Sequence, residues 1–177
     1  MLSTQKLLTL KNIDIGAGIN SLIPIDMLSV SRISHASQRL FEGELIRTVL
    51  KNKFDGKLTF TLKELLGTWS ENAALFSVGE TVTGVVRSVE SYGVFVELMP
   101  NLAGLAEPCD DLVPGQCVSV YIKSIIPDKM KIKLVIVQAF DSAAVQSELV
   151  YFDERDHIDS WHFSPTGAIK TVETYFE

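Results

Sequence analysis

The middle of the chain carries aromatic and basic side chains whose types suit contact with nucleic acid. Tyr92 and Phe95 are three positions apart in a Tyr-Gly-Val-Phe segment, and Lys131 and Lys133 alternate in Met-Lys-Ile-Lys-Leu. Aromatic rings stack on bases, and a basic track follows phosphates. Because residues three apart on a strand usually face opposite sides, a bend at Gly93 is needed to turn both rings outward.

Other polar residues do not form a recognisable catalytic or metal-binding arrangement. His157 and His162 lie near several acidic residues, namely Asp153, Asp156 and Asp159. Their spacing matches no established zinc pattern, and no cysteine is near, so a solvated acidic turn is the favoured interpretation. Serines, carboxylate pairs and His35 have no spacing typical of nucleophilic or acid–base catalysis. We therefore predict no enzyme, no metal site and no cofactor.

The elements that must position the aromatic and basic residues are short β-strands. Runs with strand composition, separated by glycine, proline and aspartate turns, cover Ser77–Val89, Tyr92–Leu98, Ala103–Ala106, Gly115–Ile122 and Met130–Leu134. Closing five such strands into a small barrel removes the exposed sheet edges. Cys109 and Cys117 form no disulfide framework and are interpreted as small, buried or half-buried side chains.

These runs carry a family pattern in a fixed order. The order is Gly-x-x-Val-x-Gly-x-Val, Tyr-Gly-x-Phe-Val, Gly-Leu, Pro-Gly-x-x-Val-x-Val and Lys-Ile-Lys-Leu. It strongly resembles the RNA-binding repeat of bacterial ribosomal protein S-one, over about 60 residues. The resemblance implies an OB-fold barrel (a small five-stranded barrel that binds oligonucleotides).

The resemblance also implies a set of RNA-binding residues. Tyr92 and Phe95 stand where the family's two stacking aromatics lie, Lys131 matches the basic residue of the last strand, and Asp128 matches the acidic position at the preceding turn. Lys133 shares the face of Lys131 by alternation. The alternative is that Phe95 belongs to the core and Tyr92 to the rim.

One position of this implied site departs from the family. The family commonly has a histidine after its Gly-Leu element, whereas Gly104-Leu105-Ala106 is followed here by Glu107. A carboxylate beside a phosphate path repels it, so we expect weaker RNA binding than for a typical repeat.

A second, partial copy precedes the complete one. Ile13–Ile15 matches 96–98, Ser21–Pro24 matches 104–107, Glu42–Val49 matches 114–121, and Asp55–Phe60 matches 128–134 with a small gap. Lys57 then matches Lys131, which adds it to the candidate RNA-binding residues. The copy lacks its first strands, for which Leu7–Leu10 could supply one. We expect the chain to resemble the C-terminal part of a longer multi-repeat protein, or a shortened relative of one.

The predicted fold is mostly β, in three segments. Residues 1–70 are an incomplete OB-like module, residues 71–140 the OB-fold domain, and residues 141–177 an acidic, β-rich extension. Their formal charges are about +3, −3 and −6, so the net charge of −6 describes neither end. The front module would expose an apolar face and an unpaired edge, which the extension with Trp161 and Tyr175, the barrel, or a second chain should cover.

Together these observations predict non-catalytic binding of single-stranded RNA, with low sequence specificity, in translation or RNA metabolism. The alternative is a protein-interaction module that docks on a ribosomal or other protein surface, which the acidic extension favours. Expected partners are single-stranded RNA, the ribosome or ribosomal proteins, and a second copy through the front module. No run is apolar and long enough to span a membrane, and no secretory signal is evident, so a cytoplasmic protein is expected.

Overall fold

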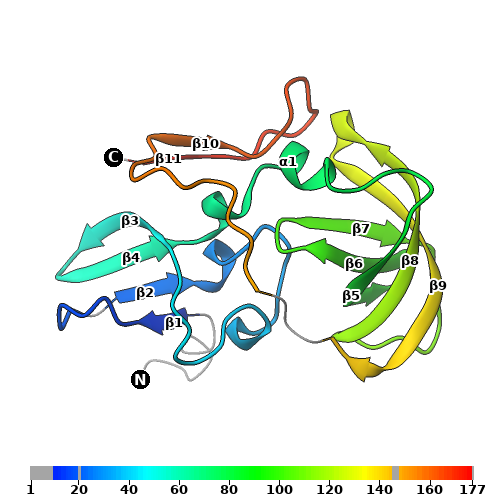
Figure 1. The fold of residues 1–177 in the computed structure, drawn as a ribbon, viewed down its shortest axis with the longest axis horizontal. Coiled ribbons are helices and arrows are strands. Elements are labelled where there is room, and N and C mark those ends of the chain that lie inside the picture. Colours follow the sequence, from blue (N-terminus) through cyan, green and yellow to red (C-terminus); the bar gives the residue numbers. More distant parts are fainter. Residues whose placement is uncertain (1–9, 20, 145–147, 177) are drawn as a thin grey trace.

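The computed structural model describes residues 10–19, 21–144 and 148–176. It is mostly β, as predicted, with a closed barrel of five strands and a four-stranded sheet before it in the chain. Figure 1 shows the sheet on the left, the barrel on the right, and the C-terminal segment running between and above them. A short helix, α1 (Trp69–Ala73), lies between the two.

The barrel closes in the order β5-β6-β7-β9-β8. Its strands are β5 (Thr81–Glu90), β6 (Gly93–Met99), β7 (Leu102–Ala106), β8 (Gln116–Ile126) and β9 (Lys131–Ala143). A short 3-10 helix, η5 (Pro127–Lys129), joins the last two. Alternate residues point inward, so that Val94, Val96, Ile132 and Leu134 are almost fully buried. This alternation leaves the intervening side chains on the outer face, where a ligand can reach them.

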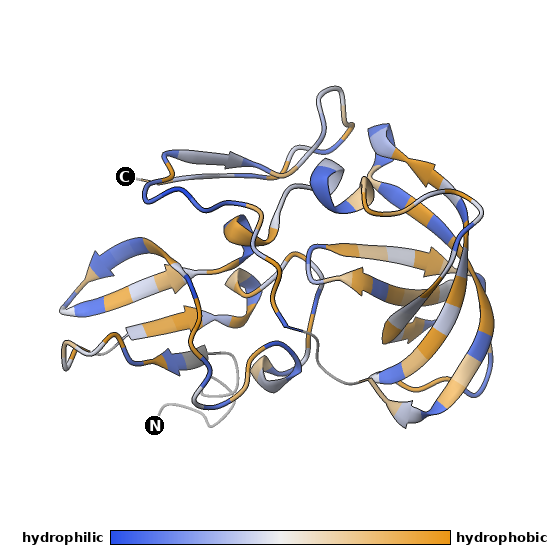
Figure 2. Ribbon diagram, in the orientation of Figure 1, coloured by the Kyte–Doolittle hydropathy of each residue, from blue (hydrophilic) through white to orange (hydrophobic). Residues whose placement is uncertain are grey.

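The last two strands are longer than the sequence predicted. We expected β8 to end near Ile122 and β9 near Leu134, but they continue to Ile126 and Ala143. They form a long hairpin whose far end pairs Gln116 with Ala143. Residues 135–143 are mostly exposed, and Figure 2 shows that the hydropathy along β9 is mixed. The hydropathy pattern could not predict this part of the strand, because without a buried face apolar and polar residues need not alternate.

The front sheet repeats four of the five barrel strands. Its strands are β1 (Leu10–Ile13), β2 (Ser21–Pro24), β3 (Val49–Phe54) and β4 (Lys57–Thr61). Their order, β1-β2-β4-β3, and their directions are those of β6-β7-β9-β8 in the barrel. Among the described residues, an equivalent of β5 is absent. Of the run Leu7–Leu10, residues 7–9 lie outside the described residues, and Leu10 begins β1.

The register of the two sheets agrees with the predicted alignment of the two copies. Leu22 pairs with Thr59 in the front sheet, as Leu105 pairs with Lys133 in the barrel. Val49 pairs with Thr61 as Tyr121 pairs with Val135. The alignment matched Leu22 with Leu105, Thr59 with Lys133 and Val49 with Tyr121, so the front sheet has the strand register of the barrel.

Residues 45–48 are not part of a strand, although the composition of residues 45–49 and their match to 117–121 of the barrel predict one. Strand β3 begins only at Val49, and Leu45 in the preceding segment is 99% exposed. In the barrel, the equivalent half of β8 pairs with β5, from Cys117 opposite Val85 to Tyr121 opposite Thr81. The described front sheet offers no such partner, so this stretch has no ladder to join.

The C-terminal segment covers both parts of the fold, by different residues from those predicted. Leu149 and Tyr151 pack on the front core around Ile23, whereas Trp161 belongs to the barrel core. Tyr175, which we expected to cover the front module, is 63% exposed. Strands β10 (Ser160–His162) and β11 (Glu173–Tyr175) pair with each other as a separate hairpin. Self-association through the front module stays a prediction.

Asn101 joins the front module to the barrel. Its side chain is 1% exposed; the amide nitrogen donates to the carbonyl oxygens of Lys63 (2.7 Å) and Gly67 (2.8 Å), and the amide oxygen accepts from the backbone nitrogen of Val30 (3.0 Å). In the sequence, Asn101 looked like an ordinary turn residue beside Pro100. Tertiary contacts give it a second use as a connector of three segments.

Replacing Asn101 by alanine should lower the free energy of unfolding by about 1–3 kcal/mol, because buried backbone groups lose their hydrogen-bond partners. Urea unfolding measures this value. The matched control is Asn52→Ala, at an exposed position of β3, which should change stability by no more than about 0.5 kcal/mol. Equal stability of both variants would contradict the connecting role of Asn101.

Candidate nucleic-acid interface

A row of side chains crosses the outer face of the barrel. Phe95 on β6 pairs with Leu105 on β7, which pairs with Lys133 on β9, which in turn pairs with Ser124 on β8. Paired residues of neighbouring strands project to the same side of a sheet. Since Val94 and Val96 on either side of Phe95 are fully buried, the ring of Phe95 points out of the barrel. The structure therefore contradicts the alternative that Phe95 is a core residue.

Tyr92 stands beside Phe95 at the start of β6. The two ring centroids are 6.2 Å apart and the planes are at 85°, an edge-to-face contact. Tyr92 is 63% exposed, whereas Phe95 is half-buried. Both rings thus lie on the outside of the barrel. Because the two residues are three positions apart, this arrangement requires the chain to bend between them.

Gly93 allows this arrangement because its backbone passes very close to the next strand. A Cβ atom built on Gly93 would lie 2.5 Å from the carbonyl oxygen of Ala106 and 2.9 Å from the side chain of Leu105. Any larger residue would push β6 away from β7. The glycine between the two aromatic residues is therefore needed for close packing of the strands that present them.

The predicted basic residues are on the same outer side. Lys131 and Lys133 are exposed and alternate with the buried Ile132 and Leu134 along β9. One strand, β7, separates Lys133 from Phe95, and Leu105 lies between them in the row. Asp128, also exposed, is in the η5 turn that leads into β9, where its carbonyl oxygen accepts from the nitrogen of Ile169 (2.9 Å). The barrel thus gathers these predicted residues around one face.

Glu107 has a partner that the sequence did not indicate. Its carboxylate lies 3.7 Å from the Lys123 ammonium, and both side chains are largely exposed, at 79% and 59%. An exposed ion pair of this kind contributes little to stability, but it places a positive charge beside the carboxylate. Lys123 therefore offsets part of the repulsion that we assigned to Glu107.

Lys57 is the one predicted residue that the fold does not bring to the barrel face. It lies at the start of β4 in the front sheet, directly opposite Phe54 of β3. Leu105, by contrast, is central to the face, yet sequence analysis did not select it. Its position depends on pairing between strands that are distant in the sequence, and an apolar residue after a glycine gives no signal of that pairing.

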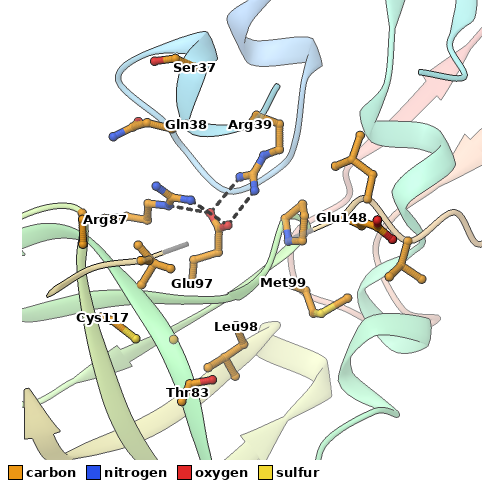
Figure 3. Close-up of a pocket in the computed structure, with 18 of the residues that line it drawn as sticks. Ser37, Gln38, Arg39, Thr83, Arg87, Glu97, Leu98, Met99, Cys117 and Glu148 are labelled. Atoms are coloured by element: carbon orange, nitrogen blue, oxygen red, sulfur yellow. Dashed lines mark hydrogen bonds and ion pairs between the residues drawn. The ribbon is translucent and has the colours of Figure 1, made fainter. Parts of the chain in front are cut away.

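A second polar cluster, which sequence analysis also missed, lies at the junction of the front module and β6. Arg39 donates to both oxygens of Glu97 (2.8 and 2.9 Å), and Arg87 does the same (2.9 and 3.0 Å). Arg39 also donates to the hydroxyl of Ser29. Figure 3 shows the two guanidinium groups meeting at the Glu97 carboxylate, on the wall of a cavity of about 650 Å³.

The carboxylate of this cluster is ionised in the folded protein. Burial raises the pKa of Glu97, but hydrogen bonds from Arg39 and Arg87 and their positive charges outweigh burial, so that the pKa lies below its ordinary value. Arg39 and Glu97 are both 5% exposed. Since the arginines direct their hydrogen bonds to Glu97, we interpret the cluster as a connection between modules.

The histidines of the C-terminal segment take part in local contacts. His157 lies 2.9 Å from Asp159, and His162 lies 3.1 Å from Glu173. In the described part of the chain, no group of three or more His, Cys, Asp or Glu side chains has an arrangement suited to a metal ion. Nor does any helix in the described ranges have the length and apolar character to cross a membrane.

Comparison with known proteins finds relatives among bacterial ribosomal proteins. The chain is 31% identical over 137 residues to small ribosomal subunit protein bS1 of Chlamydia muridarum, a match that covers 69% of this chain and 24% of that protein. It is 26% identical over 136 residues to the bS1 homolog of Bacillus subtilis, covering 69% and 35%. The chain thus spans about a quarter to a third of the length of these relatives.

The chain is also similar to two proteins that are not named as ribosomal proteins. The chain is 29% identical over 138 residues to 4-hydroxy-3-methylbut-2-enyl diphosphate reductase of Clostridium tetani, covering 70% of this chain and 22% of that protein. The structure of an uncharacterized protein of Methanocaldococcus jannaschii is 27% identical over a match that covers 33% of this chain and 89% of that one, with a TM-score of 0.32. No protein-family model matches the chain.

The sequence matches and the strand topology both identify the complete barrel as an OB-fold. The matches to bS1 proteins extend over more than two thirds of the chain, and the five strands close in OB-fold manner. The chain contains an OB-fold repeat of the ribosomal protein S-one type and resembles part of the bacterial bS1 proteins.

Proposed function

We propose that this protein binds single-stranded RNA, without catalysis and with low sequence specificity, through the outer face of the barrel. The observation that carries the proposal is the edge-to-face pair of Tyr92 and Phe95, directed outward and joined through Leu105 to Lys133. Every base has a face that can stack, so aromatic contacts of this kind do not select a sequence. The lysines supply attraction to phosphate.

The proposed setting is translation, in the cytoplasm and in association with the ribosome. The relatives in Chlamydia muridarum and Bacillus subtilis that support it are named for the small ribosomal subunit and for homology to its protein bS1. The net charge of −6 predicts modest affinity, since few phosphates are neutralised. The site residues that we assign are Tyr92, Phe95, Glu107, Asp128, Lys131 and Lys133.

The test is a titration of a short oligouridine at two salt concentrations, with wild type and Phe95→Ala. Loss of one stacking ring should weaken binding by about 1–3 kcal/mol, without changing the salt dependence, because the lysines remain. Lys133→Ala should instead reduce the salt dependence by about one ion.

A control variant separates stacking from general damage to the surface. Val137→Ala removes a 60%-exposed side chain from the distal part of β9 and should leave RNA affinity unchanged. Should Tyr92→Ala/Phe95→Ala, shown to be folded, bind RNA as tightly as wild type, the barrel face would not be the site. Docking on a ribosomal or other protein that does not depend on Tyr92 and Phe95 together, with no measurable RNA binding at low salt, would favour the protein-docking alternative.

A further inference from the structure

The hairpin of β3 and β4 places an exposed aromatic ring beside a lysine. Phe54 is 81% exposed, and its Cα partner across the hairpin is Lys57. The turn between them consists of Asp55 and Gly56, which have φ angles of 48° and 72°. Two consecutive residues with positive φ form the tight turn that matches strand twist and fixes the facing pair. Phe54 and Lys57 therefore project from the same side of the sheet.

That side corresponds to the proposed RNA face of the barrel. Leu22 and Thr59 occupy the places of Leu105 and Lys133, because each pair has the same parallel register. Asn12 then stands in the place of Phe95, opposite Leu22 on the neighbouring strand. The front face thus lacks the stacking ring at its β1 position, and the nearest exposed ring on this face of the described sheet is Phe54.

The charge around the hairpin favours a polyanion. Three lysines, at positions 51, 53 and 57, lie within seven residues that contain a single acidic residue, Asp55. Figure 2 shows β3 as mostly hydrophilic. A single exposed ring among lysines suits base stacking combined with phosphate attraction.

We propose that the β3–β4 hairpin is a second contact site for single-stranded RNA, in which Phe54 stacks on a base and Lys57 attracts a phosphate. This inference rests on the proposed function and extends it from one barrel to two modules. In this proposal the described front sheet, with one strand fewer than the barrel, has a nucleic-acid-binding face whose aromatic residue is at the hairpin tip rather than at the sheet centre.

The experiment measures the affinity of full-length protein for an oligouridine of about 16 nucleotides, the upper end of the site size of one OB-fold. Phe54→Ala/Lys57→Ala should weaken binding about tenfold, the effect of losing one stacked base and one charge. Both side chains are exposed, so the variant should fold normally, as circular dichroism would verify. The matched control, Tyr175→Ala/Lys170→Ala, removes an exposed aromatic ring and a lysine from the C-terminal segment and should bind like wild type.

A parallel titration of Tyr92→Ala/Phe95→Ala separates the two proposals. If the hairpin variant binds like wild type while the barrel variant is weakened, the hairpin is no RNA site and the proposed function stands. If only the hairpin variant is weakened, the barrel site fails and the hairpin site stands. Absence of wild-type binding at low salt would overturn both.

Discussion

Replacing Glu97 by glutamine should lower the free energy of unfolding by about 3–5 kcal/mol. The substitution keeps the shape of the side chain but leaves Arg39 and Arg87 without their shared anion. Both arginine side chains are at most 12% exposed, so water can compensate for only part of the lost carboxylate. Chemical unfolding of wild type and variant under the same conditions measures the difference.

The matched control is Glu107→Gln. Glu107 also pairs with a basic residue, Lys123, but at 3.7 Å and largely in solvent. Its loss should cost no more than about 1 kcal/mol, because solvent screens exposed ion pairs. Similar costs for the two substitutions would contradict the connecting role of the buried cluster.

A triple substitution tests whether the cost comes from stranded charge. Arg39→Met, Arg87→Met and Glu97→Leu together remove the whole cluster and leave apolar side chains of similar volume. This variant should be more stable than Glu97→Gln alone, since no buried charge is left unpaired. A triple variant less stable than Glu97→Gln would show that the hydrogen bonds themselves carry the stability.

The cluster also predicts how stability depends on pH. The pKa of Glu97 is lower in the folded than in the unfolded protein, so unfolding takes up a proton in acid. Its stabilising contribution is complete above the ordinary pKa of glutamate and is lost as the pH falls through the lowered, folded value. Wild type should therefore lose more stability than Glu97→Gln between neutral pH and about pH 3.

Replacing Trp161 by alanine should have an effect of similar size, about 3–5 kcal/mol. Trp161 is 5% exposed, belongs to the barrel core and contacts Phe163, with ring centroids 5.4 Å apart. The carbonyl oxygen of Phe163 accepts from the backbone nitrogen of Trp69 at the start of α1 (3.0 Å). Removing the indole would therefore leave a cavity where the C-terminal segment meets the barrel.

Tyr175→Ala is the control for this prediction. It removes an aromatic ring from the same C-terminal hairpin, but one that is 63% exposed, so stability should change by no more than about 0.5 kcal/mol. Thermal unfolding of the two variants would compare them directly. A stable Trp161→Ala protein would mean that the C-terminal segment is an appendage rather than a part of the core.

The sequence alone identified the five strands of the barrel, although not the full lengths of β8 and β9. Alternation of buried and exposed residues in the first half of β9 is visible as period-two hydropathy, and glycines such as Gly93 mark the close approaches. The repeat between the two copies correctly aligned the front strands, because register follows from the same pattern. These features are local, and local features can be read from neighbouring residues.

Only the tertiary structure decided what joins the modules. Arg39 and Glu97 are 58 positions apart, and Asn101 lies 34 and 38 positions from its partners at Gly67 and Lys63. No periodicity connects residues at such separations. The absence of strand in residues 45–48 has the same origin, since strand formation there requires hydrogen-bond partners on another strand, whatever the composition of the segment. Neighbouring residues therefore specified the strands. Contacts between distant segments decided which strand edges are paired and which charged and aromatic side chains are buried.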